Sequence, residues 1–108
     1  RNLDVPVMYQ GAQFDWGITP SLEGAQGAYA ATSTPKYFVK LKRGTHLEWV
    51  NLLCSGQPNV VGCLKAKPNA YLITRYGIEF LNQYLKDRPS ALLAGKGIGL
   101  DVYRFELP

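Results

Sequence analysis

The chain has 108 residues, 46% of them hydrophobic, and twelve Lys or Arg against eight Asp or Glu give it a net charge of +4. This length and composition suit one domain with a modest core, and the lack of repeats or low-complexity tracts argues against disorder. No window reaches the roughly eighteen consecutive apolar residues of a membrane span, and no signal-peptide pattern is present. We therefore treat 1–108 as a single segment.

The first predicted element is a strand over Val5–Tyr9, an apolar run without a polar face. We expect it to be buried on both faces, like strands of parallel sheets covered by helices. At the edge of a sheet it would expose unpaired backbone groups and apolar side chains, so we infer that another surface covers it.

A helix is predicted next, from Pro20 to about Ala31. Thr19 is placed to cap it and Pro20 to occupy its first turn. Gly24 and Gly27 weaken it by about 1 kcal/mol each relative to Ala, so close packing should compensate.

A second strand is predicted over Tyr37–Leu41. Alternate residues of a strand share a face, which places Lys36, Lys40 and Lys42 together, with Arg43 next to them. A solvated face is the favoured interpretation. Binding to nucleic acid is disfavoured, because no aromatic interleaving or known motif accompanies these charges.

A short helix is expected over Leu47–Leu53, followed by a loop between Cys54 and Cys63. A disulfide between these cysteines would stabilise the fold by about 3 kcal/mol and imply a secreted or periplasmic protein. Two buried thiols are the alternative. No metal site is expected, since two Cys and the single His do not make a tetrahedral ligand set at these spacings.

The strongest helical pattern covers 68–87, where apolar residues recur at steps of three and four. Arg88 and Pro89 end it. In the tail 88–108, whose structure is left open, Leu100–Leu107 suits a terminal strand or an extended segment.

The order strand, helix, strand, helix predicts an α/β fold in which the two strands run parallel. Asp15 and His46 each lie just past the end of one strand. Catalytic groups gather outside the carboxyl ends of such sheets, so we expect Asp15 to reach a ring nitrogen of His46.

Together these residues resemble the last two strands of the α/β-hydrolases, most closely bacterial esterases related to dienelactone hydrolases, chlorophyllases and cutinases. The resemblance covers residues 3–87 and rests on VPVMY at 5–9, Asp15, ITP at 18–20, YFVKL at 37–41, GTH at 44–46 and Trp49. It implies the C-terminal part of an α/β-hydrolase fold, with parallel strands and flanking helices. It also implies that Asp15 is the acid and His46 the base of a Ser-Asp-His triad.

The nucleophile of that family is missing. No Gly-x-Ser-x-Gly motif is present, nor is the loop that completes the oxyanion hole; the serines, none with such flanks, are Ser21, Ser33, Ser55 and Ser90. Cys54 is better explained as a structural cysteine than as a thiol nucleophile. The chain begins at Arg1 rather than Met, so we expect the serine on an upstream segment or a partner chain. The chain alone is predicted to be inactive.

Ordinary structural roles compete with the functional ones. A lone histidine after glycine is often a surface residue, and Asp15 alone would suit a turn. Trp16 and Trp49, with Phe14, are candidates to line an acyl-binding cleft, although aromatic residues near strand ends usually serve packing.

Three hypotheses follow. In the first, the chain is part of a carboxylic-ester hydrolase that acts on a small-molecule or polymer ester and needs no cofactor. Its partner is then the N-terminal part of the enzyme. The second is a non-catalytic remnant that associates with a second copy of itself through its exposed sheet edge. The third and weakest is a basic binding module on the lysine face.

Overall fold

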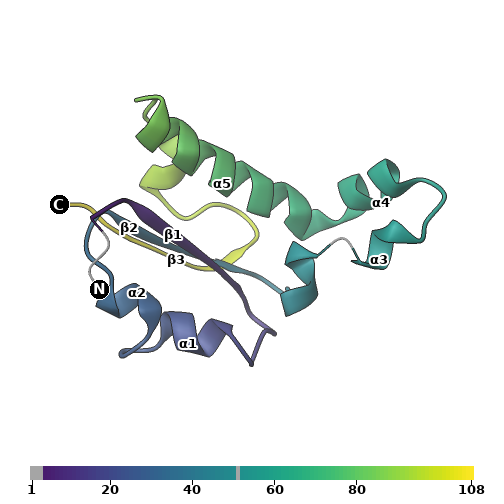
Figure 1. Ribbon diagram of the computed structural model, residues 1–108, viewed down its shortest axis with the longest axis horizontal. Helices are drawn as coiled ribbons and strands as arrows, with labels where there is room; N and C mark the ends of the chain where they lie inside the picture. Colours follow the sequence, from purple (N-terminus) through teal and green to yellow (C-terminus); the bar gives the residue numbers. More distant parts are fainter. Residues whose placement is uncertain (1–3, 51) are drawn as a thin grey trace.

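In the computed structural model, which describes residues 4–50 and 52–108, one long helix and two short helices lie on opposite faces of a three-stranded sheet (Figure 1). The strands are β1 (Val7–Ala12), β2 (Lys36–Leu41) and β3 (Leu100–Glu106). The long helix is α5 (Pro68–Leu85), and the short ones are α1 (Thr19–Glu23) and α2 (Ala28–Ala31). The principal extents are 46 × 32 × 26 Å.

The sheet is mixed, with the strand order β1-β2-β3. β1 runs parallel to β2, pairing Val7 with Lys36 and Ala12 with Leu41. β3 runs antiparallel to β2, with Glu106 opposite Lys36. The predicted C-terminal part of an α/β-hydrolase fold, with parallel strands and flanking helices, is therefore contradicted, because the sheet is mixed. The tail returns alongside β2 in the opposite direction, so the edge of β2 away from β1 carries an antiparallel strand.

The core lies between the sheet and α5. Alternate residues of β2 face the helix, and the buried cluster comprises Ala12, Tyr37, Val39, Leu41, Tyr76, Leu93 and Leu100. The structure confirms the long helix with bounds close to the predicted 68–87. The tail contributes Leu93, from the 3-10 helix η2 (Ala91–Ala94), and Leu100 of β3.

The opposite face of β2 carries the lysines, and it is covered rather than solvated. Lys36 is 6% exposed; its ammonium group donates to Tyr29 O at 3.1 Å and lies 3.4 Å from a carboxylate oxygen of Glu106. Lys40 pairs with Glu23 at 2.8 Å, and this hydrogen bond raises its pKa. The prediction of a solvated lysine face is wrong for these two residues, because α1 and α2 pack there and β3 brings carboxylates alongside. Lys42, beyond the strand, is exposed.

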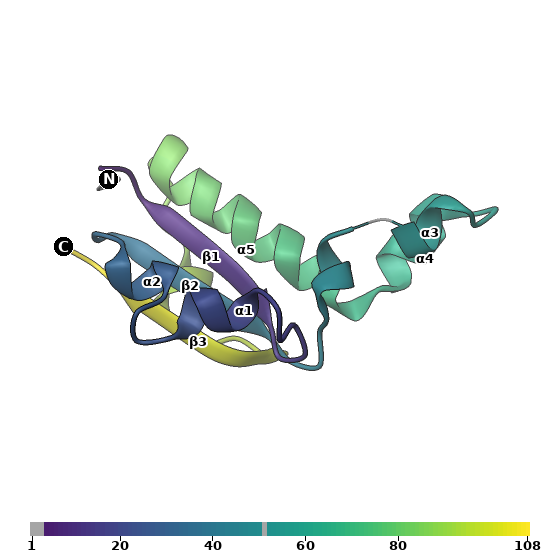
Figure 2. The same cartoon turned by 60° about the horizontal axis from the view of Figure 1, so that its bottom comes forward.

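The two N-terminal elements also differ from expectation. The single helix predicted to run to Ala31 is two short helices, because Gly24 ends α1 and Gly27 precedes α2. β1 begins at Val7 rather than Val5 and is only partly buried over its first four residues. Among the described residues it pairs with β2 alone, so its outer edge lies open (Figure 2).

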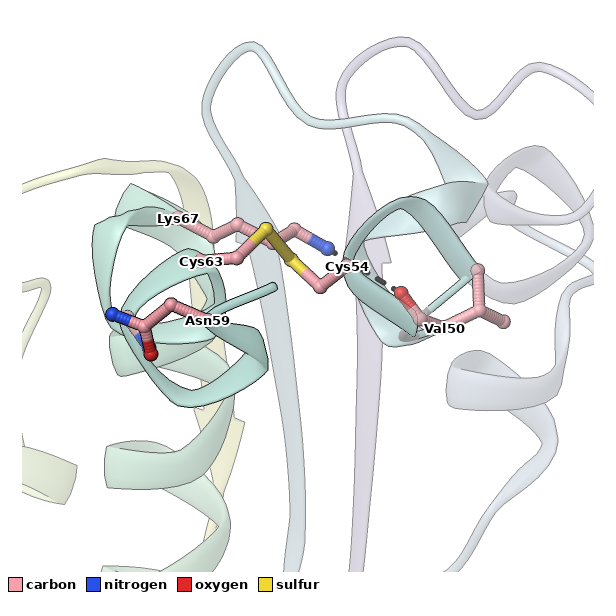
Figure 3. The surroundings of a disulfide bond; sticks show 6 residues. Val50, Cys54, Asn59, Cys63 and Lys67 are labelled. Carbon is pink, nitrogen blue, oxygen red and sulfur yellow. Dashed lines mark hydrogen bonds between the residues drawn. A yellow bond between two sulfur atoms is a disulfide. The ribbon is translucent and has the colours of Figure 1, made fainter. Parts of the chain in front are cut away.

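Beyond the carboxyl end of β2 lies a helical extension. It contains the 3-10 helix η1 (His46–Trp49), α3 (Leu52–Ser55) and α4 (Val60–Ala66), in place of the single predicted helix 47–53 and a loop. The Cys54–Cys63 disulfide joins α3 to α4 and confirms that prediction (Figure 3). Lys67 closes the base of the extension by donating to Val50 O at 3.4 Å. No helix of the described residues is long and apolar enough to cross a membrane.

The tyrosines of the core predict how the fold responds to alkali. Burial, with help from a hydrogen bond to Tyr84, raises the pKa of Tyr37 to about 12, and burial also raises the pKa values of Tyr76 and Tyr103. An unfolded tyrosine ionises near pH 10, so the neutral core tyrosines stabilise the fold fully below that pH. This stabilisation is lost as the pH rises through the folded pKa values.

We therefore expect an absorbance titration of the seven tyrosines to show an early exposed group and a later group that ionises together with loss of circular dichroism. A single ionisation step near pH 10 with an unchanged dichroism spectrum would contradict this packing.

Candidate active site

The loops that follow β1 and β2 are bound to each other at the carboxyl ends of the parallel pair. Gln13 N donates to Leu41 O at 2.9 Å, and Phe14 N donates to Gly44 O at 2.8 Å. In return, Arg43 N donates to the side-chain oxygen of Gln13 at 3.0 Å. These bonds fix the distance between the two loops, and each loop delivers one candidate catalytic residue.

Those residues meet. Asp15 Oδ2 lies 3.1 Å from His46 Nδ1. The side chain of Asp15 is 8% exposed, whereas that of His46 is 57% exposed. A buried carboxylate thus holds one ring nitrogen, while solvent reaches the rest of the ring.

The orientation of Asp15 depends on Thr19, which is 2% exposed. The Thr19 hydroxyl accepts from Ala12 N at 3.0 Å and donates to Asp15 Oδ2 at 3.4 Å. The other carboxylate oxygen accepts from Ile18 N at 3.4 Å. Gly11 permits this arrangement, since a Cβ there would lie 2.8 Å from the Thr19 hydroxyl oxygen.

His46 opens the 3-10 helix η1, and Thr45 caps it by accepting from Leu47 N at 3.3 Å. The preceding Gly44 is buried, and a Cβ there would lie 3.0 Å from Ala12 Cβ and 3.2 Å from Asn69 Nδ2. The histidine loop is therefore packed closely against β1 and the start of α5.

This geometry suits an acid–base pair. An aspartate that accepts from Nδ1–H fixes the tautomer in which Nε2 is free to take a proton, and it stabilises the imidazolium that forms. Nε2 has no hydrogen-bond partner among the described residues.

The two predicted aromatic site residues have different surroundings. Trp16 is 77% exposed and its ring lies 5.9 Å from that of Phe14. Trp49 packs against the core, and its indole N–H donates to Gln10 Oε1 at 3.0 Å. Gln10 also donates to Ile73 O at 3.2 Å, so Trp49 is tied to β1 and α5. A substrate role for either tryptophan stays a prediction, and Trp49 has a clear structural role.

Within the described part of the chain, His46 hydrogen-bonds to no serine, and no three His, Cys, Asp or Glu side chains gather as metal ligands. The arrangement seen here is a dyad of acid and base.

The sequence interpretation missed what Thr19 does. It was assigned as a helix cap, but Ile18 occupies that position and Thr19 is the first residue of α1. Its spacing of four residues from Asp15 was the available signal, because that separation lets the side chain fold back onto the carboxylate. Asn69, which is 8% exposed at the start of α5, was also missed.

A scan of protein-family models gives no match to the chain, and searches of curated proteins and of solved structures give none either. The resemblance to bacterial esterases therefore stays a prediction.

Thr19→Val should destabilise the fold by roughly 1–3 kcal/mol, because it leaves the buried Ala12 N–H without its acceptor. Thr19→Ser keeps the hydroxyl and should destabilise the fold clearly less than Thr19→Val does. Urea unfolding followed by circular dichroism measures both. Equal stability of the valine and serine variants would show that the hydroxyl does not brace the loop.

Proposed function

We propose that this chain supplies the acid and the base of a serine carboxylic-ester hydrolase, whose nucleophile lies on a preceding segment or a partner chain. The observation that carries the proposal is the 3.1 Å contact between Asp15 and His46. It joins a buried carboxylate to an imidazole that solvent reaches, and the two belong to loops held together by backbone hydrogen bonds.

In this proposal His46 Nε2 takes the proton of the serine hydroxyl as the oxygen attacks the ester carbonyl. The imidazolium then protonates the departing alcohol, leaving an acyl-serine. In the second half, His46 takes a proton from a water molecule as the water oxygen attacks the acyl carbonyl. It then gives that proton to the serine oxygen as the bond to the acyl carbon breaks and the acid leaves. The Asp15 carboxylate holds the ring through Nδ1 and stabilises the imidazolium.

The open side of the molecule supports the need for a partner surface. β1 presents an unpaired outer edge within the described chain, and Val5 beside it is 57% exposed. α5 also exposes apolar side chains to solvent: Ile78, Leu81 and Leu85 are each at least half exposed. An edge strand with apolar surface around it favours further association.

The substrate in this proposal is a small-molecule or polymer ester. Phe14 and Trp16 follow β1 on the Asp15 loop, are both exposed and contact each other, so they are candidates to bind an acyl chain. We further propose a secreted or periplasmic location. The disulfide is compatible with an extracellular one.

A serine-directed fluorophosphonate tests the proposal on the assembly that contains this chain. We expect covalent labelling of the segment or chain that carries the serine. His46→Ala should lower ester hydrolysis by about 10⁴-fold or more, because the serine loses its base. Leu47→Ala truncates the exposed neighbouring side chain and should leave activity within a few-fold. Absence of labelling from every associated chain, or full activity of His46→Ala, ends the proposal.

The open edge of β1 also favours a second candidate function, a non-catalytic remnant that pairs with a second copy of itself. Light scattering on the purified chain distinguishes the two. A stable homodimer that recruits no larger partner and hydrolyses no ester favours the remnant. A monomer that gains activity on addition of the serine-bearing segment excludes it.

A further inference from the structure

A pocket of about 640 Å³ lies beside the histidine loop, and no step proposed above uses it. Lys42 and Arg43 line it from the end of β2, and Lys67 and Asn69 line it from the start of α5. Leu72 and Ile98 supply apolar wall. Two loops and a helix terminus therefore converge on one cavity.

The cations of this pocket are not neutralised by ion pairs within the described residues. Lys42 and Arg43 are exposed and form no salt bridge there, and Lys67 donates to a backbone carbonyl instead of a carboxylate. Lys40, on the covered face of the sheet, contrasts with them because it contacts two carboxylates. Glu48 is the acidic residue of the lining, so three positive charges and one negative charge leave a net charge of +2.

Asn69 is the second, independent feature. It lines the pocket, is 8% exposed, and its side chain makes no hydrogen bond with the described residues. The amide of Asn69 borders the cavity, and because the described residues do not use its donors and acceptor, they are available to a polar ligand there. Asn69 also lies in the first turn of α5, an 18-residue helix, whose dipole favours an anion at this end.

The apolar wall restricts the kind of anion. Ile98 is 97% exposed although it borders the pocket, and Leu72 lies beneath the Gly99 turn, where a Cβ would be 2.7 Å from its side chain. A ligand that covers these side chains gains from burying apolar surface, which a bare inorganic anion cannot do.

We propose that this pocket binds an organic carboxylate, with its carboxylate group at Lys42, Arg43 and Asn69 and its hydrocarbon part against Leu72 and Ile98. A carboxylate suits the paired donors of Arg43 and the amide of Asn69. The binding site does not depend on the proposed ester hydrolysis, because none of these residues belongs to the Asp15–His46 pair.

Titration of the ¹⁵N-labelled chain with sodium hexanoate tests the proposal by two-dimensional NMR. We expect saturable shifts of the amide signals of Asn69, Leu72 and Gly99, and no such shifts with hexanol at the same concentrations. Equal shifts with hexanol would reduce the site to an apolar cavity and overturn the proposal. Equal affinity for inorganic phosphate would also overturn it, since the hydrocarbon part would then contribute nothing.

The double variant Lys42→Gln/Arg43→Gln should weaken hexanoate binding by at least about tenfold, because both charge-assisted contacts are lost. Lys86→Gln/Arg88→Gln removes the same charge at the far end of α5 and should bind hexanoate as the unaltered chain does. Equal hexanoate affinities of the two double variants would show that binding depends only on the net charge of the chain, and would overturn the proposed site at this pocket.

Asn69→Asp keeps the size of the side chain and places a negative charge in the pocket, so it should abolish binding. If this variant fails to fold, as judged by circular dichroism, the comparison of the two double variants still tests whether hexanoate binds at this pocket. The readout is binding to this chain alone. Fluorophosphonate labelling without hexanoate binding would remove only this proposal, and hexanoate binding without labelling would remove only the hydrolase.

Discussion

The in-register parallel pairing of β1 with β2 is the constraint on which the candidate site depends. Pairing Val7 with Lys36 and Ala12 with Leu41 makes the two strands end together, so the loops that follow emerge side by side. A shift by one residue would turn every side chain of β1 to the other face of the sheet. Asp15 and His46 are 31 residues apart in the chain and meet only because this register holds.

The most specific prediction from the sequence was also local. Asp15 and His46 each follow a strand closely, and two parallel neighbours leave little freedom for where short loops place such residues. The same locality explains why α5 and the Cys54–Cys63 disulfide were predictable. A helical pattern can be recognised from one continuous stretch of sequence. A chain with two cysteines has one possible internal disulfide.

What the sequence did not predict depends on contacts between distant segments. The tail was known to suit a strand, but its antiparallel direction along β2 is set by the path through α5 and η2. The lysine face was expected to be solvated because alternation alone cannot show that Glu23 and Glu106 approach it from other elements. Thr19 illustrates the same limit, since its hydroxyl acts on Asp15 and Ala12 at once.

The two faces of β2 use charge in opposite ways. On the face covered by α1 and α2, Lys36 and Lys40 are partly or fully buried, and burial of a cation is tolerable only with partners, which the acidic side chains of α1 and β3 provide. Past the end of the strand that constraint is absent, because Lys42 and Arg43 keep their hydration and need no partner for stability. The positive charges of Lys42 and Arg43 form no ion pair within the described residues and so remain available for a ligand. They lie on the same short loop that carries His46.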